Sequence, residues 1–144
     1  MKVATTAAAI IMSAAPVAAH HSLSEYDLAG KLTLTVTVRE FHFVNPHPYL
    51  VAELDVLGRR SLGAGGALKQ VWRLELDNRF ELVEIGMTAK TFTQGDRLLV
   101  SGAPGRDQKS ILYVRELDRL ADGFRYEQPS STPRIVRPGT NRVP

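Results

Sequence analysis

The stretch KLTLTVTVR at residues 31–39 alternates strictly between apolar and polar side chains. A period of two places the leucines and valines on one face of an extended chain and the threonines on the other. Several of these residues are β-branched, which favours a pleated surface that is buried on one side. The stretch therefore predicts a half-buried β-strand and indicates a β fold.

Four further segments have strand patterns and are separated by turn signals. The glycine-rich residues 58–66 indicate a hairpin loop. The two prolines within residues 45–48 require a turn or an extended loop, because they remove backbone donors and disfavour helix before them. The remaining expected strands are residues 49–57, 70–77, 97–101 and 111–120.

The apolar period changes between the third and the fourth expected strand, which indicates a short helix. Its apolar residues are Phe80, Leu82, Val83 and Ile85. Asp77 or Asn78 would cap its N-terminus, and Gly86 would end it. Three strands, a helix and two strands is the order of an OB-type barrel. We therefore predict an all-β fold with one short helix, an OB-like five-stranded antiparallel barrel; a small antiparallel sandwich is the alternative.

The first 19 residues have the pattern of a secretory signal peptide. Lys2 supplies a positive charge, residues 7–12 form an apolar run, and residues 17–19 are the small residues accepted at a cleavage site. The apolar run is shorter than the ~20 residues that a membrane-spanning helix needs. We expect cleavage after Ala19, a periplasmic or secreted protein, and no transmembrane segment after cleavage.

The remaining chain has room for one domain. We assign residues 20–120 to the barrel and residues 121–144, rich in Pro and Arg, to an irregular tail. The chain has no cysteine, which excludes disulfides, thiolate metal sites and thiol nucleophiles. Its net charge is +3, but basic and acidic residues are interleaved, which argues against nucleic-acid binding. We expect a monomer.

All four histidines of the chain lie between residues 20 and 47. Cleavage after Ala19 would make His20 the first residue, so that its α-amine and imidazole could chelate a metal ion, with His21 beside it. Nitrogen-rich sites of this kind suit Cu(II), with Ni(II) or Zn(II) as alternatives.

The third expected ligand, His47, follows the first strand. If residues 28–30 turn the chain back, the leader would run antiparallel beside the first strand. His20 and His21 would then lie opposite about residues 39–41, at the end of the strand that leads to His47. Glu25 or Asp27 could then add an oxygen ligand or a partner for an imidazole N–H.

Simpler interpretations of these histidines stay open. His20 and His21 can form an unstructured N-terminal pair, and His47, between two prolines, can serve only to shape its turn. His42 lies between two aromatic residues and can equally be a partly buried strand residue.

Several short motifs occur in a fixed order along the chain. They are His20-His21-Ser22, Phe41-x-Phe43-x-Asn45-Pro46-His47, Trp72-x-Leu74-Glu75, Gly95-Asp96 and Gly102-x-Pro104. This ordered set resembles a periplasmic bacterial domain family of unknown function over about residues 20 to 120. The resemblance implies export and a small β-barrel, and it favours His20, His21 and His47 over His42. It implies no reaction.

Our first hypothesis is a periplasmic binding protein that holds a divalent metal, copper before nickel or zinc, through His20, His21 and His47. The alternative is a metal-free module that binds a periplasmic protein, a peptide or a glycan. We expect a binding protein before an enzyme, and a serine hydrolase is not predicted, because no serine has the G-x-S-x-G setting. A copper oxidase or oxygenase would also need an open coordination position.

Overall fold

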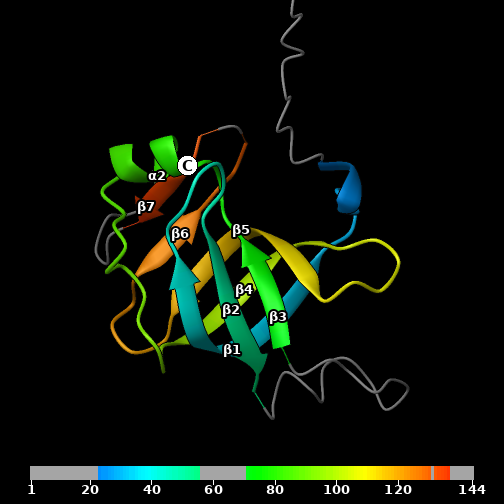
Figure 1. Cartoon of the computed structure of the whole chain (residues 1–144), viewed down its shortest axis with the longest axis horizontal. Coiled ribbons are helices and arrows are strands. Elements are labelled where there is room, and N and C mark those ends of the chain that lie inside the picture. The colour runs from blue at the N-terminus through cyan, green and yellow to red at the C-terminus, as the bar shows by residue number, and fades with distance from the viewer. Residues whose placement is uncertain (1–22, 56–70, 131, 137–144) are drawn as a thin grey trace, which may run out of the picture.

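The computed structural model describes residues 23–55, 71–130 and 132–136. A short 3-10 helix, η1 (Leu23–Glu25), precedes the barrel elements (Figure 1). These are β1 (Leu32–His42), β2 (Tyr49–Leu54), β3 (Val71–Glu75), α2 (Arg79–Glu84), β4 (Arg97–Pro104) and β5 (Ile111–Arg119). The expected order of three strands, a helix and two strands is confirmed. Two short strands follow, β6 (Arg125–Glu127) and β7 (Arg134–Val136).

The first five strands form a closed ring. They are joined in the order β3-β2-β1-β4-β5, and β3 also pairs with β5. All of these pairs are antiparallel except β3–β5, which is parallel. A closed ring with an odd number of strands cannot alternate in direction all the way round, so one pair must be parallel. The OB-like barrel is therefore confirmed, with this one parallel pair as a correction to the expected antiparallel pattern.

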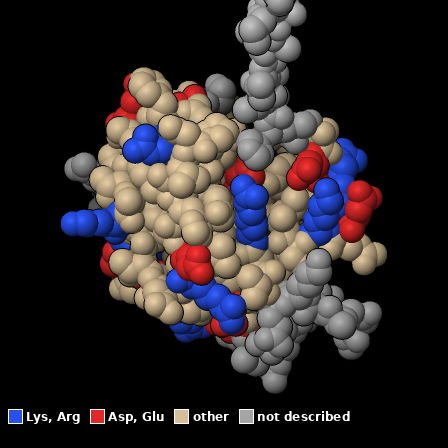
Figure 2. Space-filling view, viewed as in Figure 1, with Lys and Arg blue, Asp and Glu red and all other residues tan. Residues whose placement is uncertain are grey.

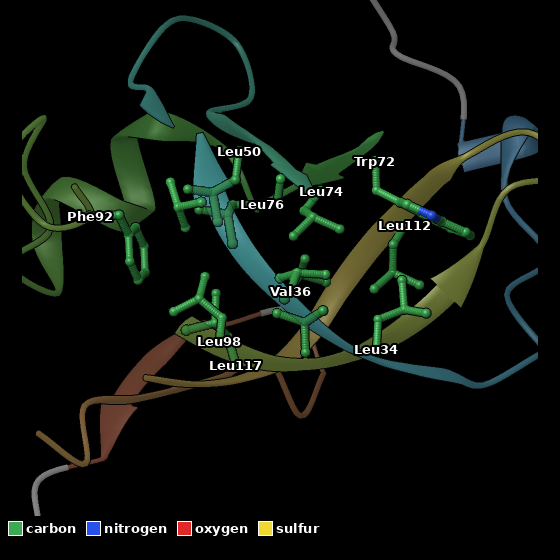
Figure 3. Close-up of a cluster of buried hydrophobic side chains, with 14 of the residues drawn as sticks. Leu34, Val36, Leu50, Trp72, Leu74, Leu76, Phe92, Leu98, Leu112 and Leu117 are labelled. Carbon is green, nitrogen blue, oxygen red and sulfur yellow. The ribbon is translucent and has the colours of Figure 1, made fainter. Parts of the chain in front are cut away.

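The alternation in β1 works as the sequence predicts. Leu34, Val36 and Val38 are buried in the barrel, and the threonines between them are not. The first half of β1 pairs with β4 and the second half with β2, and the register shifts between Val38 and Glu40. Other side chains that fill the barrel include Leu50, Leu74, Leu76, Leu98, Leu112 and Leu117 (Figure 3). Each buried leucine stabilises the fold by roughly 2 kcal/mol.

The short helix α2 has the ends that the sequence predicts. The Asn78 side chain accepts a hydrogen bond of 3.0 Å from the backbone N–H of Glu81. Gly86 follows the helix with a φ of 93°, which glycine adopts without a steric cost. The helix packs through Leu82, which is fully buried.

The prediction of an irregular tail is wrong for residues 125–127 and 134–136. They form β6, which pairs with β5, and β7, which pairs with β6. Tyr126 lies fully buried among the core residues, and the Glu127 carboxylate bonds with Arg125 and Arg134. Strands of three residues are too short to show a period in the sequence, so they depend on contacts with the barrel.

The segment before β1 also differs from the expectation. Tyr26 pairs with Gly105, and the backbone N–H of Asp27 donates to the Pro104 carbonyl at 2.8 Å. The described part of the leader therefore lies beside the end of β4, not along β1 as expected, and His20 and His21 lie outside the described residues. The physical reason is that β4 already pairs with residues 32–37 of β1, the part of the strand that follows the expected turn. Within the described ranges, no helix has the length and apolarity needed to cross a bilayer.

Candidate functional site

The outer surface of β2 and β3 carries polar side chains where the inner surface carries core residues. Tyr49 on β2 points to the same side as Glu75 on β3, since these residues are paired in register. Val51 and Arg73 form the next outward pair, and Leu50 and Leu74 between them point into the barrel. This surface is the front of the view in Figures 1 and 2, where separate basic and acidic side chains are interleaved.

Three planar side chains stack across this surface. The ring of His42 on β1 lies 4.6 Å from the ring of Tyr49, with the planes 14° apart. The guanidinium carbon of Arg73 lies 4.2 Å from the centroid of the same tyrosine ring. Since β2 runs between β1 and β3, the tyrosine ring is contacted from both neighbouring strands. The Nε2 atom of His42 also lies 2.7 Å from Glu40, so this imidazole has partners on the surface.

Glu75 anchors the leader to this surface. This residue is only 5% exposed, and its carboxylate accepts a hydrogen bond of 3.0 Å from the Tyr26 hydroxyl. Arg73 lies 3.7 Å from the same carboxylate oxygen. Burial, and then the charge of Glu75, raise the pKa of Tyr26, so this phenol stays protonated and acts as a donor.

The segment after β6 reaches the same region. The Gln128 amide donates to the Tyr113 hydroxyl at 2.9 Å and also to the Asp77 carboxylate. The Tyr113 ring lies 5.6 Å from the ring of Tyr26. Burial raises the pKa of Tyr113, which therefore stays protonated like Tyr26. The barrel surface thus joins residues from both ends of the described chain.

A groove of about 450 Å³ runs beside Arg73. Val51, Val71 and Ile111 give it an apolar floor, and Arg73 and Lys109 add positive charge; Trp72 and Ser110 complete the lining. The Arg73 side chain is 43% exposed and the Lys109 side chain 48%. The lining is therefore complementary to a ligand that has an apolar body and a negatively charged group.

A second groove, of about 360 Å³, lies between residues 28–31 and strands β4 and β5. Its lining carries charges of both signs, from Lys31, Arg115 and Glu116, whereas the charged side chains that line the groove beside Arg73 are all positive. Lys31 lies 3.7 Å from Glu116, and Ser101 lies 3.4 Å from the other oxygen of that carboxylate. We therefore take the groove beside Arg73 as the candidate functional site.

Comparison with protein families links the chain to a known group. Residues 8–112 match the model of a family of unknown function, DUF6152. The chain belongs to DUF6152. The match confirms the family resemblance that the motifs indicate. Neither the curated proteins nor the solved structures contain a match.

The match ends at the second residue of β5, so β6 and β7 lie beyond the stretch that matches the DUF6152 model. The groove residues Val51, Val71, Arg73 and Lys109 all lie within it, as does Ile111. The candidate site is therefore built from the part of the chain that the family model covers.

Of the three metal ligands expected in this DUF6152 chain, the structure describes one. His20 and His21 lie outside the described residues. His47 is partly buried in the loop between β1 and β2, after a cis peptide bond between Asn45 and Pro46. In residues 23–55, 71–130 and 132–136, no three of His, Asp and Glu lie close enough together to hold a metal ion.

The described leader lies near the start of β1, whereas His47 follows its end. Across the barrel, however, the Tyr26 hydroxyl of the leader bonds to Glu75, which is paired with Tyr49. Glu25 and Asp27 lie with the leader, where Glu25 is 3.7 Å from Lys109. The structure therefore pairs Glu25 with Lys109, and among the described residues neither Glu25 nor Asp27 belongs to a group of three potential metal ligands.

The groove and the Glu75 cluster of this DUF6152 protein were not predicted. The strand period does place Val71, Arg73 and Glu75 on one face, so that signal was available. The position of Tyr26 and Gln128 against this face depends on long-range contacts, for which the sequence shows no pattern.

Proposed function

We propose that this protein is an exported binding module that holds an extended peptide segment in the groove beside Arg73. The observation that carries the proposal is the combination of an apolar floor, formed by Val51, Val71 and Ile111, with two half-exposed cations at its margin. A peptide with apolar side chains and a carboxylate, either an acidic residue or a C-terminus, matches this combination.

The position of Arg73 supports anion binding. Its guanidinium group rests on the ring of Tyr49 and lies near Glu75, so less side-chain freedom remains to be lost when a ligand binds. The planar guanidinium group offers several N–H donors and can bind both oxygens of a carboxylate, which the ammonium group of a lysine does less well. The Tyr26 hydroxyl already satisfies one oxygen of Glu75, so this buried carboxylate does not depend on Arg73 alone.

Lys109 lies in the connection between β4 and β5 and also lines the groove. Its Nζ atom lies 3.7 Å from the carboxylate of Glu25, and both side chains are about half exposed. Exposed ion pairs of this kind contribute about 1 kcal/mol or less, so a ligand carboxylate can compete with Glu25 for Lys109.

Selection from a peptide display library, with a chelator present, tests this function. We expect the selected peptides to combine apolar residues with an acidic side chain or a free C-terminal carboxylate. Arg73→Ala should weaken their binding about tenfold or more, since hydrogen bonds to charged groups contribute about 1.5–3 kcal/mol. Lys90→Ala is the matched control, because it removes the same charge from an exposed loop between α2 and β4. Equal binding by Arg73→Ala and Lys90→Ala would remove the proposal.

Export is part of the proposal and has its own test. The residues that support it are Lys2, the apolar run at residues 7–12 and the small residues at 17–19. Mass spectrometry of the protein recovered from the periplasm should give a mature chain that begins at His20. A chain that keeps Met1 and stays in the cytoplasm would contradict export.

Metal binding is a second candidate function, supported by the confinement of all four histidines to residues 20–47. Cu(II) would be held by His20 and His21, with His47 as a third ligand. Calorimetric titration of processed protein should show tight Cu(II) binding that His20→Ala weakens strongly. His42→Ala is the control, because this imidazole stacks on Tyr49. Affinity no higher than that of a histidine-free peptide would exclude the site.

A further inference from the structure

The ring of strands is open on one side of β3, next to Val71. β3 pairs with β5 from Arg73 onward, where Arg73 lies beside Ile111. The N–H of Arg73 donates to the Ser110 carbonyl at 3.0 Å, so the backbone groups of Arg73 point toward β5. Alternate residues of a strand direct these groups to the same edge, so those of Val71 point there too. In the described ranges, β5 pairs with no residue of β3 before Arg73, so the N–H and C=O of Val71 lie on an open edge.

This open edge borders the groove beside Arg73. Val71 is 38% exposed, and the lining of the groove comes mainly from residues 71–73 of β3 and from residues 109–111 at the start of β5. An exposed strand edge binds an extended peptide through main-chain hydrogen bonds, while neighbouring pockets select its side chains. The groove therefore suits a peptide that adds to β3 as a further strand.

The open edge closes at Arg73, which limits the bound peptide in one direction. Ser110 already occupies the position beside Arg73, and Ile111 follows it. A peptide strand beside Val71 that continued toward Arg73 would meet the main chain of β5, so the position favours a strand that ends there. The end of such a peptide lies next to the positive side chains of Arg73 and Lys109. A C-terminal carboxylate matches these charges, whereas an N-terminal ammonium group would be repelled.

The charges also determine the direction of the bound strand. A C-terminus at the Arg73 end means that the peptide runs in the same direction as β3. The first residues of β5 run in this direction as well, since β3 and β5 are parallel. The peptide would therefore extend the line of β5 on the side that precedes Ile111.

The indole of Trp72 supplies a further donor. Trp72 lines the groove and is 7% exposed, and Figure 3 shows its ring at one end of the core cluster. Its Nε1 atom is buried and has no hydrogen-bond partner within residues 23–55, 71–130 and 132–136. Buried polar atoms are nearly always bonded, so this N–H favours a ligand that brings an acceptor to the Trp72 ring.

We propose that the groove captures the C-terminus of a partner polypeptide, which binds as an added strand parallel to β3. The last residues of the peptide pair with the backbone of Val71, and the terminal carboxylate binds Arg73 and Lys109. Apolar side chains of the peptide lie against Val51 and Ile111. This inference rests on the proposed function and specifies its ligand, because the carboxylate belongs to the end of a chain and not to an acidic side chain.

An array of random synthetic peptides, each made with a free C-terminal carboxylate and with a C-terminal carboxamide, tests the capture of a chain end. We expect the carboxamides to bind about tenfold or more weakly than the free acids, because hydrogen bonds to a charged group are lost. Carboxamides with an internal acidic residue that bind as tightly as the free acids, and still need Arg73, would overturn this inference but leave the proposed function intact. If no form of the peptides needs Arg73, the proposed function fails as well.

Val71→Pro tests the added strand, because it removes the N–H that the open edge offers. Proline is tolerated at the first residue of a strand, and β5 accepts no bond from this N–H. We therefore expect an unchanged urea midpoint and about fivefold weaker binding of a selected free-acid peptide. Val71→Thr keeps the N–H and the branched shape, and it is the matched control. Equal binding by the two folded variants would overturn the strand pairing.

N-methylation of the peptide gives the same test without a change in the protein. Methylation of every second amide, the set that faces β3, should weaken binding, whereas methylation of the amides between them should be tolerated. The indole N–H signal of Trp72 should shift in NMR spectra when the unmethylated peptide binds. If no methylated position weakens binding, or if the sensitive positions do not alternate, the peptide does not bind as a strand.

Discussion

Gly102 lies in β4 where the register against β5 shifts, and Gly102→Ala should destabilise the protein strongly. A Cβ atom at this position would overlap the carbonyl oxygen of Tyr113. It would also lie 2.9 Å from the carbonyl carbon of Tyr113 and 3.1 Å from the backbone nitrogen of Arg115. All of these are backbone atoms, so no side-chain rotation can relieve the overlap, and β4 must move away from β5.

The size of the effect follows from what this movement disrupts. Overpacking a tight core costs about 1–3 kcal/mol, and each disturbed backbone hydrogen bond adds about 1 kcal/mol. With one such bond lost, we expect a loss of about 3 kcal/mol in the free energy of unfolding. The total free energy of unfolding of a domain is about 5–15 kcal/mol, so the variant should still fold at low temperature.

Gly86→Ala is the matched control, because it makes the same chemical change where space is open. No atom lies within 4 Å of a Cβ built on Gly86, and the cost comes only from its φ of 93°. A positive φ costs an alanine about 1–2 kcal/mol. The two variants therefore separate the effect of close strand packing from the effect of backbone conformation.

Urea unfolding followed by the fluorescence of Trp72, the one tryptophan, measures both variants. With a slope of about 1.5 kcal/mol per molar urea, the midpoint should fall by about 2 M for Gly102→Ala and by about 1 M for Gly86→Ala. Equal midpoints with equal slopes would refute the close approach of β4 and β5 at this residue.

Three further substitutions test other contacts. Tyr126→Ala should cost about 3–5 kcal/mol in urea unfolding, since the side chain is fully buried; a change below 1 kcal/mol would contradict the docking of β6. Tyr26→Phe should cost about 1–3 kcal/mol, because it leaves a buried oxygen of Glu75 without its donor; an unchanged urea midpoint would argue against this bond. Glu127→Gln should lower stability at pH 7, and the loss should be smaller at pH 3. Arg134 and then Arg125 lower the pKa of Glu127, so its stabilisation exists above its ordinary pKa and disappears as the pH falls through the folded value. An equal stability loss at both pH values, measured by urea unfolding, would show that the ion pairs are not the cause.

The sequence predicted the elements that have a local signal. The alternation at residues 31–39 identified β1, and Asn78 and Gly86 marked the ends of α2. The order of the elements then led to the OB-like barrel, which the structure confirms. These features depend on period and capping, which a few neighbouring residues determine.

The features that the sequence did not predict depend on contacts between distant residues. Tyr26 meets Glu75 across 49 positions, and Gln128 meets Asp77 across 51. The three-residue strands β6 and β7 gain their stability from β5 and from the burial of Tyr126. The sequence located Arg73 on the outer face, but the groove beside it also needs Ile111 and Lys109 from the other side of the parallel pair.

The most direct test of the proposed function is an NMR titration of the ¹⁵N-labelled mature protein with a selected peptide, with a chelator present. Binding in the groove predicts that the largest amide shifts belong to Val51, Val71, Arg73 and Ile111. Shifts confined to residues away from the groove, for example to β6 and β7, would contradict the account.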